Sequence, residues 1–441
     1  MGQSTFKGGT HPYEGKELSM DSPIQVMDPK EELVFSMSQH IGAPATPVVA
    51  VGDTVKMGQI IGEASGFISA NIVSSVSGEV KKIETRLLSS GAKAPCVVIA
   101  NDGEYTPVDG LGEERDYTKL SKEEIRQIIK DAGIVGMGGA GFPTNVKVTP
   151  KNEEDIDYVI VNGAECEPYL TSDYRLMLEK PEEIIQGLRV VLSLFDHAKG
   201  VIAIEDNKPE AISKLQYLTE GDSNIEVKTL KTKYPQGAER QIIYVATGRR
   251  IHSKMLPADA GCIVDNVQTI IAIYNAVCKC TPSMSRVITL TGDAMAKPQN
   301  YEVKFGMSHA EMLEEAGGLK EGGAKKLISG GPMMGMAMYD LNTPVTKTSS
   351  SILAMSRDEV AEWEPTNCIR CGRCADVCPS HLVPQMMAQA AERDDLEYFQ
   401  KINGMECYEC GTCTFVCPAK RRLTQIFKQA RRAVMDASRK K

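Results

Sequence analysis

GIVGMGGAGFPTNVKV (residues 133–148) is followed closely by YVIVNGAECEP (residues 158–168), and together the two segments indicate an α/β fold. The first is rich in glycine, so its backbone can approach a phosphate or a ring and direct amides at it. The second is an apolar strand that ends in amide and acidic side chains, and doubly wound sheets bind cofactors at the carboxyl ends of their strands. A glycine cluster alone also fits a tight surface turn. The order of predicted helix (122–132), glycine-rich loop, Lys147 and strand therefore indicates a cofactor-binding α/β domain.

Two cysteine runs near the C-terminus share one spacing. CIRCGRCADVCP (368–379) recurs as CYECGTCTFVCP (407–418), with every cysteine shifted by 39 residues. The pattern C-x2-C-x2-C-x3-C-P is typical of two-cluster bacterial ferredoxins, in which three thiolates of one run and the fourth of the other run hold each 4Fe–4S cluster. The predicted ligands are Cys368, Cys371, Cys374 and Cys417 for the first cluster, and Cys407, Cys410, Cys413 and Cys378 for the second.

Zinc is the alternative metal for these cysteines, because C-x2-C pairs also form zinc sites. Four tetrahedral ligands would leave the three-plus-one repeat unexplained, so the repeat favours two cubane clusters. Between the runs, residues 382–401 are expected to form one amphipathic helix that returns the chain. The other cysteines have no partner at ligand spacing and are expected to be structural thiols: Cys96, Cys166, Cys262, Cys278 and Cys280.

Two further segments predict small β domains on either side of the α/β domain. Residues 48–83 contain short β-rich stretches separated by glycines and resemble a lipoyl or biotinyl sandwich. The expected hairpin tip, EASGFI (63–68), has no lysine to carry a swinging arm, so a scaffold role is expected. Residues 286–340 suggest strand, turn, strand, helix (309–316) and strand, the order of a β-grasp unit. Its methionine-rich stretch (333–338) is interpreted as an apolar strand used in core or interface packing.

Composition and charge exclude several classes of protein. The net charge of −8 argues against nucleic-acid binding, which requires basic surface along the phosphates. No stretch reaches the ~20 apolar residues that a bilayer crossing needs, so no transmembrane segment is expected. The first 15 residues lack the apolar run of a secretory signal, which predicts a cytosolic chain. Thiols are kept reduced in the cytosol, so disulfides are not expected.

The C-terminal segment, residues 420–441, is strongly basic. It contains nine Lys or Arg residues and one acidic residue, Asp436, with apolar residues at helical spacing. Such a helix can pack on the cluster module with its charged face in solvent, or it can dock on an acidic partner or a membrane surface. The sequence leaves both interpretations open.

The glycine-rich loop and the acidic segment together resemble the NADH-binding, FMN-bearing subunit of respiratory complex I, whose loops read GRGGAGFPTGxK and NADEGEP. Downstream, YPQGAE (234–239) and DNVQT (265–269) resemble that family's second flavin loop and its NNVET segment. The residues that this resemblance assigns to FMN and NAD(H) are Gly136, Gly138, Gly139, Gly141, Phe142, Lys147, Asn162, Glu165, Glu167, Tyr234, Gly237, Glu239, Asn266 and Thr269. It implies catalytic roles for Lys147, Glu165 and Glu167 through position and charge near the ring. One position departs from the family, because Ala164 stands where complex I has an aspartate, which puts one flavin hydrogen bond in question.

The whole chain, including TFKGGTHP (5–12) and SQHIGAPATP (38–47), resembles the RnfC (RsxC) family, the soluble subunits of membrane-bound Rnf ferredoxin:NAD oxidoreductases. The resemblance implies that NAD(H) and FMN exchange a hydride and that electrons then pass singly through both clusters. It implies as partners the membrane subunits of the Rnf complex and its ferredoxin-like subunit. It also implies a peripheral position on the cytoplasmic side of the cell membrane.

The predicted fold is therefore a multidomain α/β chain. Its parts are an N-terminal lipoyl-like sandwich (1–112), an FMN/NADH-binding α/β domain (113–284), a β-grasp SLBB domain (285–342), a linker (343–356) and a helical two-cluster ferredoxin module (357–441). Two other functions remain open. Cobalamin reductases of bacterial microcompartments share a similar layout, and an electron-wiring subunit could keep the flavin fold without its cofactor.

Overall fold

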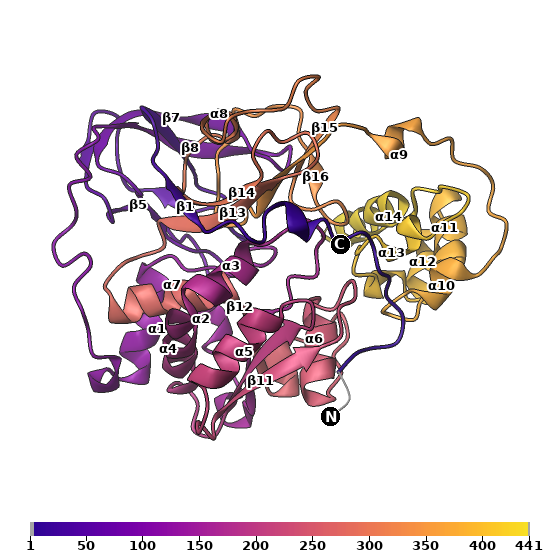
Figure 1. Ribbon diagram of the computed structural model, residues 1–441, viewed down its shortest axis with the longest axis horizontal. Coiled ribbons are helices and arrows are strands. Elements are labelled where there is room, and N and C mark those ends of the chain that lie inside the picture. The colour runs from indigo at the N-terminus through magenta and orange to yellow at the C-terminus, as the bar shows by residue number, and fades with distance from the viewer. Residues whose placement is uncertain (1–3, 440–441) are drawn as a thin grey trace.

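The computed structural model describes residues 4–439, which form four packed parts (Figure 1). In chain order they are a β sandwich, an α/β domain, a mixed sheet and a helical module that holds both cysteine runs. This arrangement confirms the predicted multidomain α/β fold class. Figure 1 places the helical module, in yellow, beside the other parts, with one long connection running around its outer side. No described helix is long and apolar enough to cross a bilayer.

The α/β domain is built on a parallel sheet of four strands in the order β11-β10-β9-β12. The strands are β9 (Tyr158–Gly163), β10 (Lys199–Glu205), β11 (Ile225–Leu230) and β12 (Cys262–Asn266). Their apolar centres are buried because helices cover both faces, as parallel strands require. β10 pairs with one edge of β9 and β12 pairs with the other. Successive strands are therefore added first on one side of β9 and then on the other, which creates a topological switch point beside β9.

Helices cover both faces of this sheet. They are α1 (Lys122–Asp131), α3 (Ser172–Glu179), α4 (Pro181–Leu192), α5 (Pro209–Leu218), α6 (Glu239–Thr247) and α7 (Val267–Cys278). α1 is the helix predicted before the glycine-rich loop, and it begins at a capping box formed by Ser121 and Glu124. Because side chains alternate along a strand, Val161 faces the core under α4 and α7, whereas Ile160 faces α6.

The β sandwich packs directly on the mixed sheet. One of its sheets contains β2 (Glu32–Ser36), β4 (Thr54–Val55), β7 (Gly78–Leu87) and β8 (Lys93–Asn101), and the other contains β3 (Thr46–Pro47), β5 (Ile60–Glu63) and β6 (Ile72–Val73). Phe35 and Ile99 of the sandwich share one buried core with Leu290 and Phe305 of the mixed sheet. The two parts therefore share one hydrophobic core, and the scaffold role stays a prediction.

The mixed sheet has six strands in the order β1-β14-β13-β17-β15-β16. The predicted segment supplies β13 (Ser285–Thr291), β14 (Gln299–Lys304), α8 (His309–Glu315), β15 (Lys326–Ser329) and the short β16 (Met336–Ala337). The apolar strand predicted over 333–338 is wrong for most of its length, because only the two residues of β16 pair, and Met334 and Met336 are about half exposed, at 49% and 46%. β1 (Gln25–Met27) joins this sheet from far away in the sequence.

The linker predicted over 343–356 is wrong. Residues Ser351–Met355 form β17, which lies between β13 and β15 with Ile352, Leu353 and Ala354 fully buried. The prediction missed this short strand because the polar residues just before it resemble a surface linker. Several of these polar residues are in fact buried. The connection to the cluster module is instead the next segment, residues 356–367, which contains α9 (Glu359–Glu362).

Lys347, just before β17, is fully buried, and its ammonium donates to Asn71 O and Gly133 O, each at 2.6 Å. Burial lowers the pKa of Lys347 to about 7. The unfolded chain therefore binds more protons than the folded chain between pH 7 and the ordinary lysine pKa of 10.5, so stability should rise with pH in that window.

Lys347→Met should remove this rise. We expect the unfolding free energy of the unmodified chain to increase by about 2 kcal/mol between pH 7 and pH 9 from this group, and the increase to be absent in the variant. Urea unfolding at both pH values measures it, with Lys81→Met, an exposed lysine, as the matched control. A variant that keeps the full increase contradicts the assignment.

The helical module contains α10 (Arg373–Asp376), α11 (Pro384–Glu392), α12 (Leu396–Lys401), α13 (Thr412–Phe415) and α14 (Leu423–Arg439). The single helix predicted over 382–401 is wrong. Asp394 has a left-handed φ of 56°, which ends α11, and the side chain of Asp395 then caps α12 by accepting from Tyr398 N at 2.9 Å. Two short helices with a turn between them therefore return the chain.

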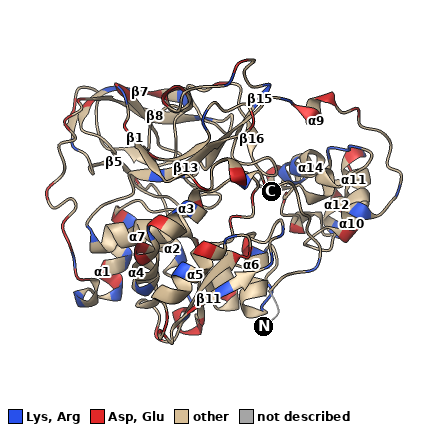
Figure 2. Cartoon of the chain, in the orientation of Figure 1, with Lys and Arg blue, Asp and Glu red and all other residues tan. Residues whose placement is uncertain are grey.

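α14 packs on this module along one apolar stripe. Leu423, Phe427, Ala430 and Val434 are buried, which agrees with the interpretation of a helix packed on the cluster module. Figure 2 shows basic positions on α14 and α10 of the module. The last two residues of the predicted basic segment, 440–441, lie outside the described residues.

The first described residues, 4–19, lie outside the sandwich and cross the carboxyl edge of the parallel sheet. We call them the strap. Ser4 pairs with Leu230 at the end of β11, and Thr10 pairs with Tyr234 in the loop that follows. Figure 1 shows this indigo segment running along the boundary between the α/β domain and the yellow cluster module.

Candidate flavin and iron–sulfur sites

The parallel sheet gathers the predicted flavin segments at one edge. β9 and β12 end at Asn162–Gly163 and Asn266, and β11 leads into the 234–239 loop. Because parallel strands all point the same way, these ends meet on the same side of the sheet as the switch point. The glycine-rich loop approaches from the β12 side, where Met137 N donates to Thr269 Oγ1 at 2.9 Å.

The glycine-rich loop is fixed at its ends and open in the middle. Gly136 N donates to Phe142 O at 2.9 Å, which closes the loop, and Gly141 adopts φ +71° against the sandwich, where a Cβ would lie 3.1 Å from the His40 Cα. A Cβ on Gly138 would lie 2.8 Å from the Asn266 Cβ. Gly139 is exposed, and a Cβ there would meet nothing within 4 Å. The loop thus keeps an open backbone surface on its outer side.

Lys147 lies under this loop in a charged pair. Its ammonium contacts Asp265 Oδ1 at 3.0 Å and donates to Val264 O at 2.8 Å. Burial raises the pKa of Asp265, and Lys147 opposes that shift. Asp265 Oδ2 is buried without a hydrogen-bond partner. Desolvation also raises the pKa of Glu239, and Lys147 opposes that shift. The site beside the loop therefore contains a buried carboxylate oxygen without a hydrogen-bond partner next to the Lys147 ammonium.

The two glutamates predicted to be catalytic point to different partners. Glu165, at φ 46°, accepts from Asp173 N at 2.7 Å and Tyr174 N at 3.2 Å in the first turn of α3, a helix without a side-chain cap of its own. Burial raises the pKa of Glu165 to about 7, and Lys16 opposes the shift. Glu167 accepts from Met333 N at 2.7 Å in the loop before β16. Each carboxylate thus fixes the acidic loop to a neighbouring element.

Three polar residues in this region could not be found from the sequence. Lys208 Nζ donates to Ala164 O at 2.7 Å, so a buried lysine holds the backbone at the position where complex I has an aspartate. Asp173 accepts from the Asn266 side chain at 2.6 Å. Lys16 reaches the acidic loop from the strap. No spacing or motif marks these residues, because each lies far along the chain from the groups it contacts.

The second flavin loop touches the cluster module. Tyr234, predicted to bind flavin, is buried and donates its hydroxyl to Cys410 O at 2.7 Å. Asn162 Nδ2 donates to Gly237 O at 2.8 Å, which ties the loop to the end of β9. Cys166 accepts from Gly237 N at 3.3 Å, and burial raises the pKa of its thiol. The loop is therefore in contact with both candidate sites.

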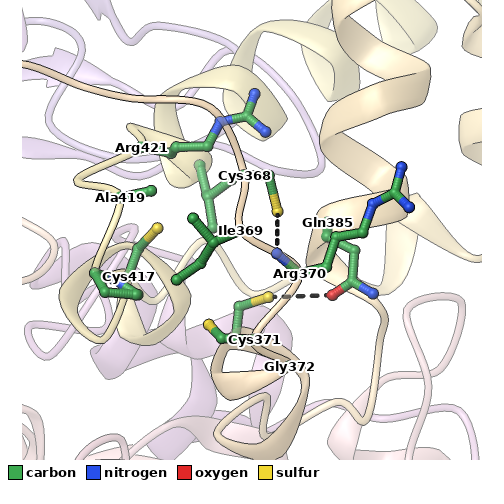
Figure 3. A pocket seen from close by; sticks show the side chains of 12 residues that line it. Cys368, Ile369, Arg370, Cys371, Gly372, Gln385, Cys417, Ala419 and Arg421 are labelled. Atoms are coloured by element: carbon green, nitrogen blue, oxygen red, sulfur yellow. Dashed lines mark hydrogen bonds between the residues drawn. The ribbon is translucent and has the colours of Figure 1, made fainter.

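The cysteines predicted to hold the first cluster line one cavity (Figure 3). The four are Cys368, Cys371, Cys374 and Cys417. Arg370, Arg421 and Gln385 complete its rim, and Gln385 Oε1 lies 3.5 Å from Cys374 Sγ. Cys371 is exposed, and Ile369 beside it is 66% exposed. This cavity lies at the surface of the module.

The cysteines predicted to hold the second cluster line a separate cavity. They are Cys378, Cys407, Cys410 and Cys413. None of the four is exposed, and Met387 and Phe427 of the module core complete the lining. In both runs the glycine after the second cysteine, Gly372 or Gly411, has a left-handed φ that turns the chain around the cavity. Each cavity therefore joins three thiols of one run with the fourth of the other, as a pair of 4Fe–4S clusters requires.

Four family models match successive parts of the chain. They are the RnfC barrel sandwich hybrid domain over residues 4–104, the Nuo51 FMN-binding domain over 129–275, the SLBB domain over 287–337 and a 4Fe-4S dicluster domain over 362–418. A chain of an NAD+-reducing NiFe-hydrogenase in its H2-reduced state gives a TM-score of 0.51 at 19% identity, covering 72% of this chain and 63% of that one. This likeness is one of fold alone.

Two relatives are similar over most of their own length. The C subunit of the proton-translocating ferredoxin:NAD(+) oxidoreductase complex of Clostridium ljungdahlii is 43% identical over 390 residues, which cover 88% of this chain and 85% of the relative. The C subunit of the Na(+)-translocating ferredoxin:NAD(+) oxidoreductase complex of Acetobacterium woodii is 42% identical over 436 residues, which cover 99% of this chain and 98% of the relative.

Proposed function

The chain belongs to the RnfC family, the C subunits of ion-translocating ferredoxin:NAD(+) oxidoreductase complexes, and from this premise we propose how its residues serve that reaction. It is a subunit of this enzyme with an FMN-binding domain and a dicluster ferredoxin domain. We infer that NAD(H) and FMN meet at the carboxyl edge of the parallel sheet. Bound FMN supplies the exchange between the two-electron chemistry of nicotinamide and the one-electron chemistry of the clusters.

The residues at this edge fit FMN. Gly139 leaves the outer side of its loop free of a side chain, so backbone N–H groups there can bind a phosphate or a ring carbonyl. Asp265 Oδ2 needs a donor, and a ribityl hydroxyl can supply one. Lys147 holds a positive charge beside this carboxylate. The other residues proposed to line the site are Gly136, Gly138, Gly141, Phe142, Asn162, Tyr234, Gly237, Glu239, Asn266 and Thr269.

Glu165 and Glu167 act in this proposal by holding the acidic loop beside the nicotinamide. Both carboxylates accept backbone N–H groups, and these hydrogen bonds oppose the rise in pKa that burial causes at each of them. Lys147 is proposed to act through its charge near the flavin. Enzyme sites usually stabilise the charge that develops on a substrate or cofactor with charged groups that are already in position and do not have to move during the reaction.

Electrons are proposed to reach the second cluster before the first. The observation that carries this proposal is the hydrogen bond from Tyr234, in the second flavin loop, to the carbonyl of Cys410, a ligand of the second cluster. The first cluster lies beyond it, and its ligand Cys371 is exposed. This order gives the first cluster the surface through which a partner exchanges electrons.

Analysis of the anaerobically purified chain tests the proposed function. We expect extractable FMN, about eight iron and about eight sulfide atoms per chain, and NADH:ferricyanide activity. Clusters without FMN or this activity would leave the electron-wiring alternative. Reduction of cob(II)alamin at a rate comparable with that of ferricyanide would favour the cobalamin reductase instead, although the identity with the two relatives supports the RnfC assignment.

The partners proposed are the membrane subunits of the complex and its ferredoxin-like subunit, with the chain peripheral on the cytoplasmic side of the membrane. The names of the two relatives support assembly with an ion-translocating complex but give different ions, so identity alone does not assign the ion. Co-purification with integral-membrane redox subunits from detergent-solubilised membranes tests the assembly. Recovery of the chain alone under conditions that keep such complexes together contradicts it.

Tyr234→Phe should slow the flow of electrons into the clusters. The change removes one buried hydrogen bond and leaves the Cys410 carbonyl unpaired, at a cost of about 1–3 kcal/mol. We expect the rate at which NADH bleaches the clusters to fall relative to the NADH:ferricyanide activity of the same variant. Tyr217→Phe, at an exposed tyrosine of α5, is the matched control. Equal bleaching rates in both variants would remove the support for this contact as part of the electron path.

A further inference from the structure

The strap, residues 4–19, touches the second cluster's binding segment. Gly9 N donates to Val377 O at 2.8 Å. Gly8 lies against the same segment, because a Cβ there would meet Cys378 O at 3.0 Å and Val377 O at 3.1 Å. Cys378 is the ligand that the first cysteine run lends to the second cluster. The other three proposed ligands lie close together in the second cysteine run, whereas Cys378 comes from the first run. The strap therefore packs on the one ligand whose position the second run does not fix.

The same residues also bind the second flavin loop. Thr10 N donates to Tyr234 O at 2.8 Å, and Tyr234 N donates to Thr10 O at 2.9 Å. Lys233 Nζ donates to Phe6 O at 2.9 Å, and the Phe6 ring is buried in the core under α6. A Cβ on Gly9, whose φ is +79°, would meet Tyr234 O at 2.7 Å. Gly8 and Gly9 thus fill the space between the flavin loop and Cys378 with backbone alone.

Lys16 anchors the other end of the strap under the acidic loop. Its nitrogen donates to Glu165 O at 2.9 Å, Glu167 O at 3.1 Å and Leu170 O at 2.6 Å. Three donated bonds require the protonated ammonium. Gly15, at φ +60°, allows the turn into this anchor because a Cβ would meet the Tyr169 ring at 2.5 Å. One strand of chain is therefore fixed to the acidic loop, the flavin loop and the second cluster's fourth ligand.

We propose that the strap sets the separation between the flavin site and the second cluster, and that Gly8 and Gly9 are positioning residues for electron transfer between them. The inference rests on the proposed order of electron flow. The cluster module is otherwise connected to the rest of the chain through residues 356–367 and through side-chain contacts such as that of Arg240 with Glu406 at 2.8 Å. The strap adds backbone hydrogen bonds to the flavin loop on one side and to the Val377 segment on the other. Long, flexible side chains such as Arg240 lose more conformational entropy when they are held in place, so they do not replace these bonds.

Gly9→Ala tests the proposal. The methyl group must displace Tyr234 O, so the flavin loop and the Val377 segment move apart. We expect FMN and iron contents to be kept, NADH:ferricyanide activity within twofold, and NADH-driven bleaching of the clusters slowed by about tenfold or more, since an error of ~1 Å in placement is costly in such reactions. Loss of iron from the second cluster would instead contradict the positioning role, because it would show that Gly9 is needed for cluster binding itself.

Gly112→Ala is the matched control. Gly112 has a φ of +84°, close to that of Gly9, but a Cβ there would meet nothing within 4 Å, so this variant bears only the backbone strain. Equal bleaching rates in the two variants would overturn the proposal. If Gly9→Ala fails to fold, Gly8→Ala replaces it, because its contacts of 3.0 Å and 3.1 Å need smaller displacements.

Amide hydrogen exchange gives a readout that does not depend on NADH. In Gly9→Ala, the amide of residue 9 should exchange faster than in the control, because it loses the hydrogen bond that it donates to Val377 O. Unchanged exchange contradicts the proposed contact. An unmodified chain without NADH:ferricyanide activity would instead refute the proposed function. Faster exchange in Gly9→Ala would still show, in that case, that the strap is hydrogen-bonded to the Val377 segment.

Discussion

Cys410→Ala should abolish NADH-driven reduction of the first cluster while the chain keeps its NADH:ferricyanide activity. The variant removes a ligand of the second cluster, which lies between the flavin loop and the first cluster in the proposed order. Ferricyanide takes electrons from the flavin directly, so that activity needs neither cluster. Electron paramagnetic resonance after mixing with NADH, with dithionite reduction to count the clusters that are present, measures the effect.

The converse variant, Cys371→Ala, is the control for this order. Cys371 is exposed, lines the first cavity and is a proposed ligand of the first cluster. Its loss should leave the second cluster reducible by NADH and should stop electron delivery to an external protein acceptor. If Cys371→Ala blocks reduction of the second cluster while Cys410→Ala leaves the first cluster reducible, the order of the clusters is the reverse of the one proposed.

Gly139→Val should abolish FMN binding without destabilising the chain. The new side chain points into open space, with nothing within 4 Å in the chain itself, so only a bound group is displaced. We expect FMN affinity to fall by on the order of 100-fold or more, which corresponds to ~2.7 kcal/mol. Flavin fluorescence titration of the chain stripped of FMN measures the affinity, and thermal unfolding of the same material measures the stability.

Gly66→Val provides the control for this change. Gly66 is an exposed glycine in the sandwich, and a Cβ there meets only Ala43 Cβ at 3.7 Å. The control should match the unmodified chain in both measurements. Full retention of FMN by Gly139→Val would place the flavin away from the glycine-rich loop and would refute the assignment of that loop.

The sequence predicted the features that depend on neighbours in the chain. The capping box at Ser121 marks the start of α1, and the apolar run YVIV forms β9, because both signals are local. The cysteine spacing predicts two quartets that the structure gathers into two cavities, since each set lies within one repeat apart from a single exchanged member. Local patterns of this kind need no knowledge of the rest of the fold.

Features that depend on distant partners could not be predicted. β17 follows a run of polar residues in which the buried Lys347 bonds to carbonyls of residues 71 and 133, far away in the sequence. α11 and α12 are separated by a left-handed Asp394, and no proline or glycine marks that break. Lys16 resembles an ordinary surface lysine in the sequence, and its burial follows from three carbonyls about 150 residues away. Neither periodicity nor motif spacing records such contacts.

The strap also affects how the chain is made. Gly9 is synthesised before its partner Val377, and more than 360 residues separate the two. The strap can therefore form its contact with Val377 only after the C-terminal module has been synthesised and folded, and closing so long a loop is a late event. Affinity tags fused before residue 4 lie next to this closure. We expect maturation in cells to be more sensitive to N-terminal fusions than to insertions in the exposed turn at residues 89–92.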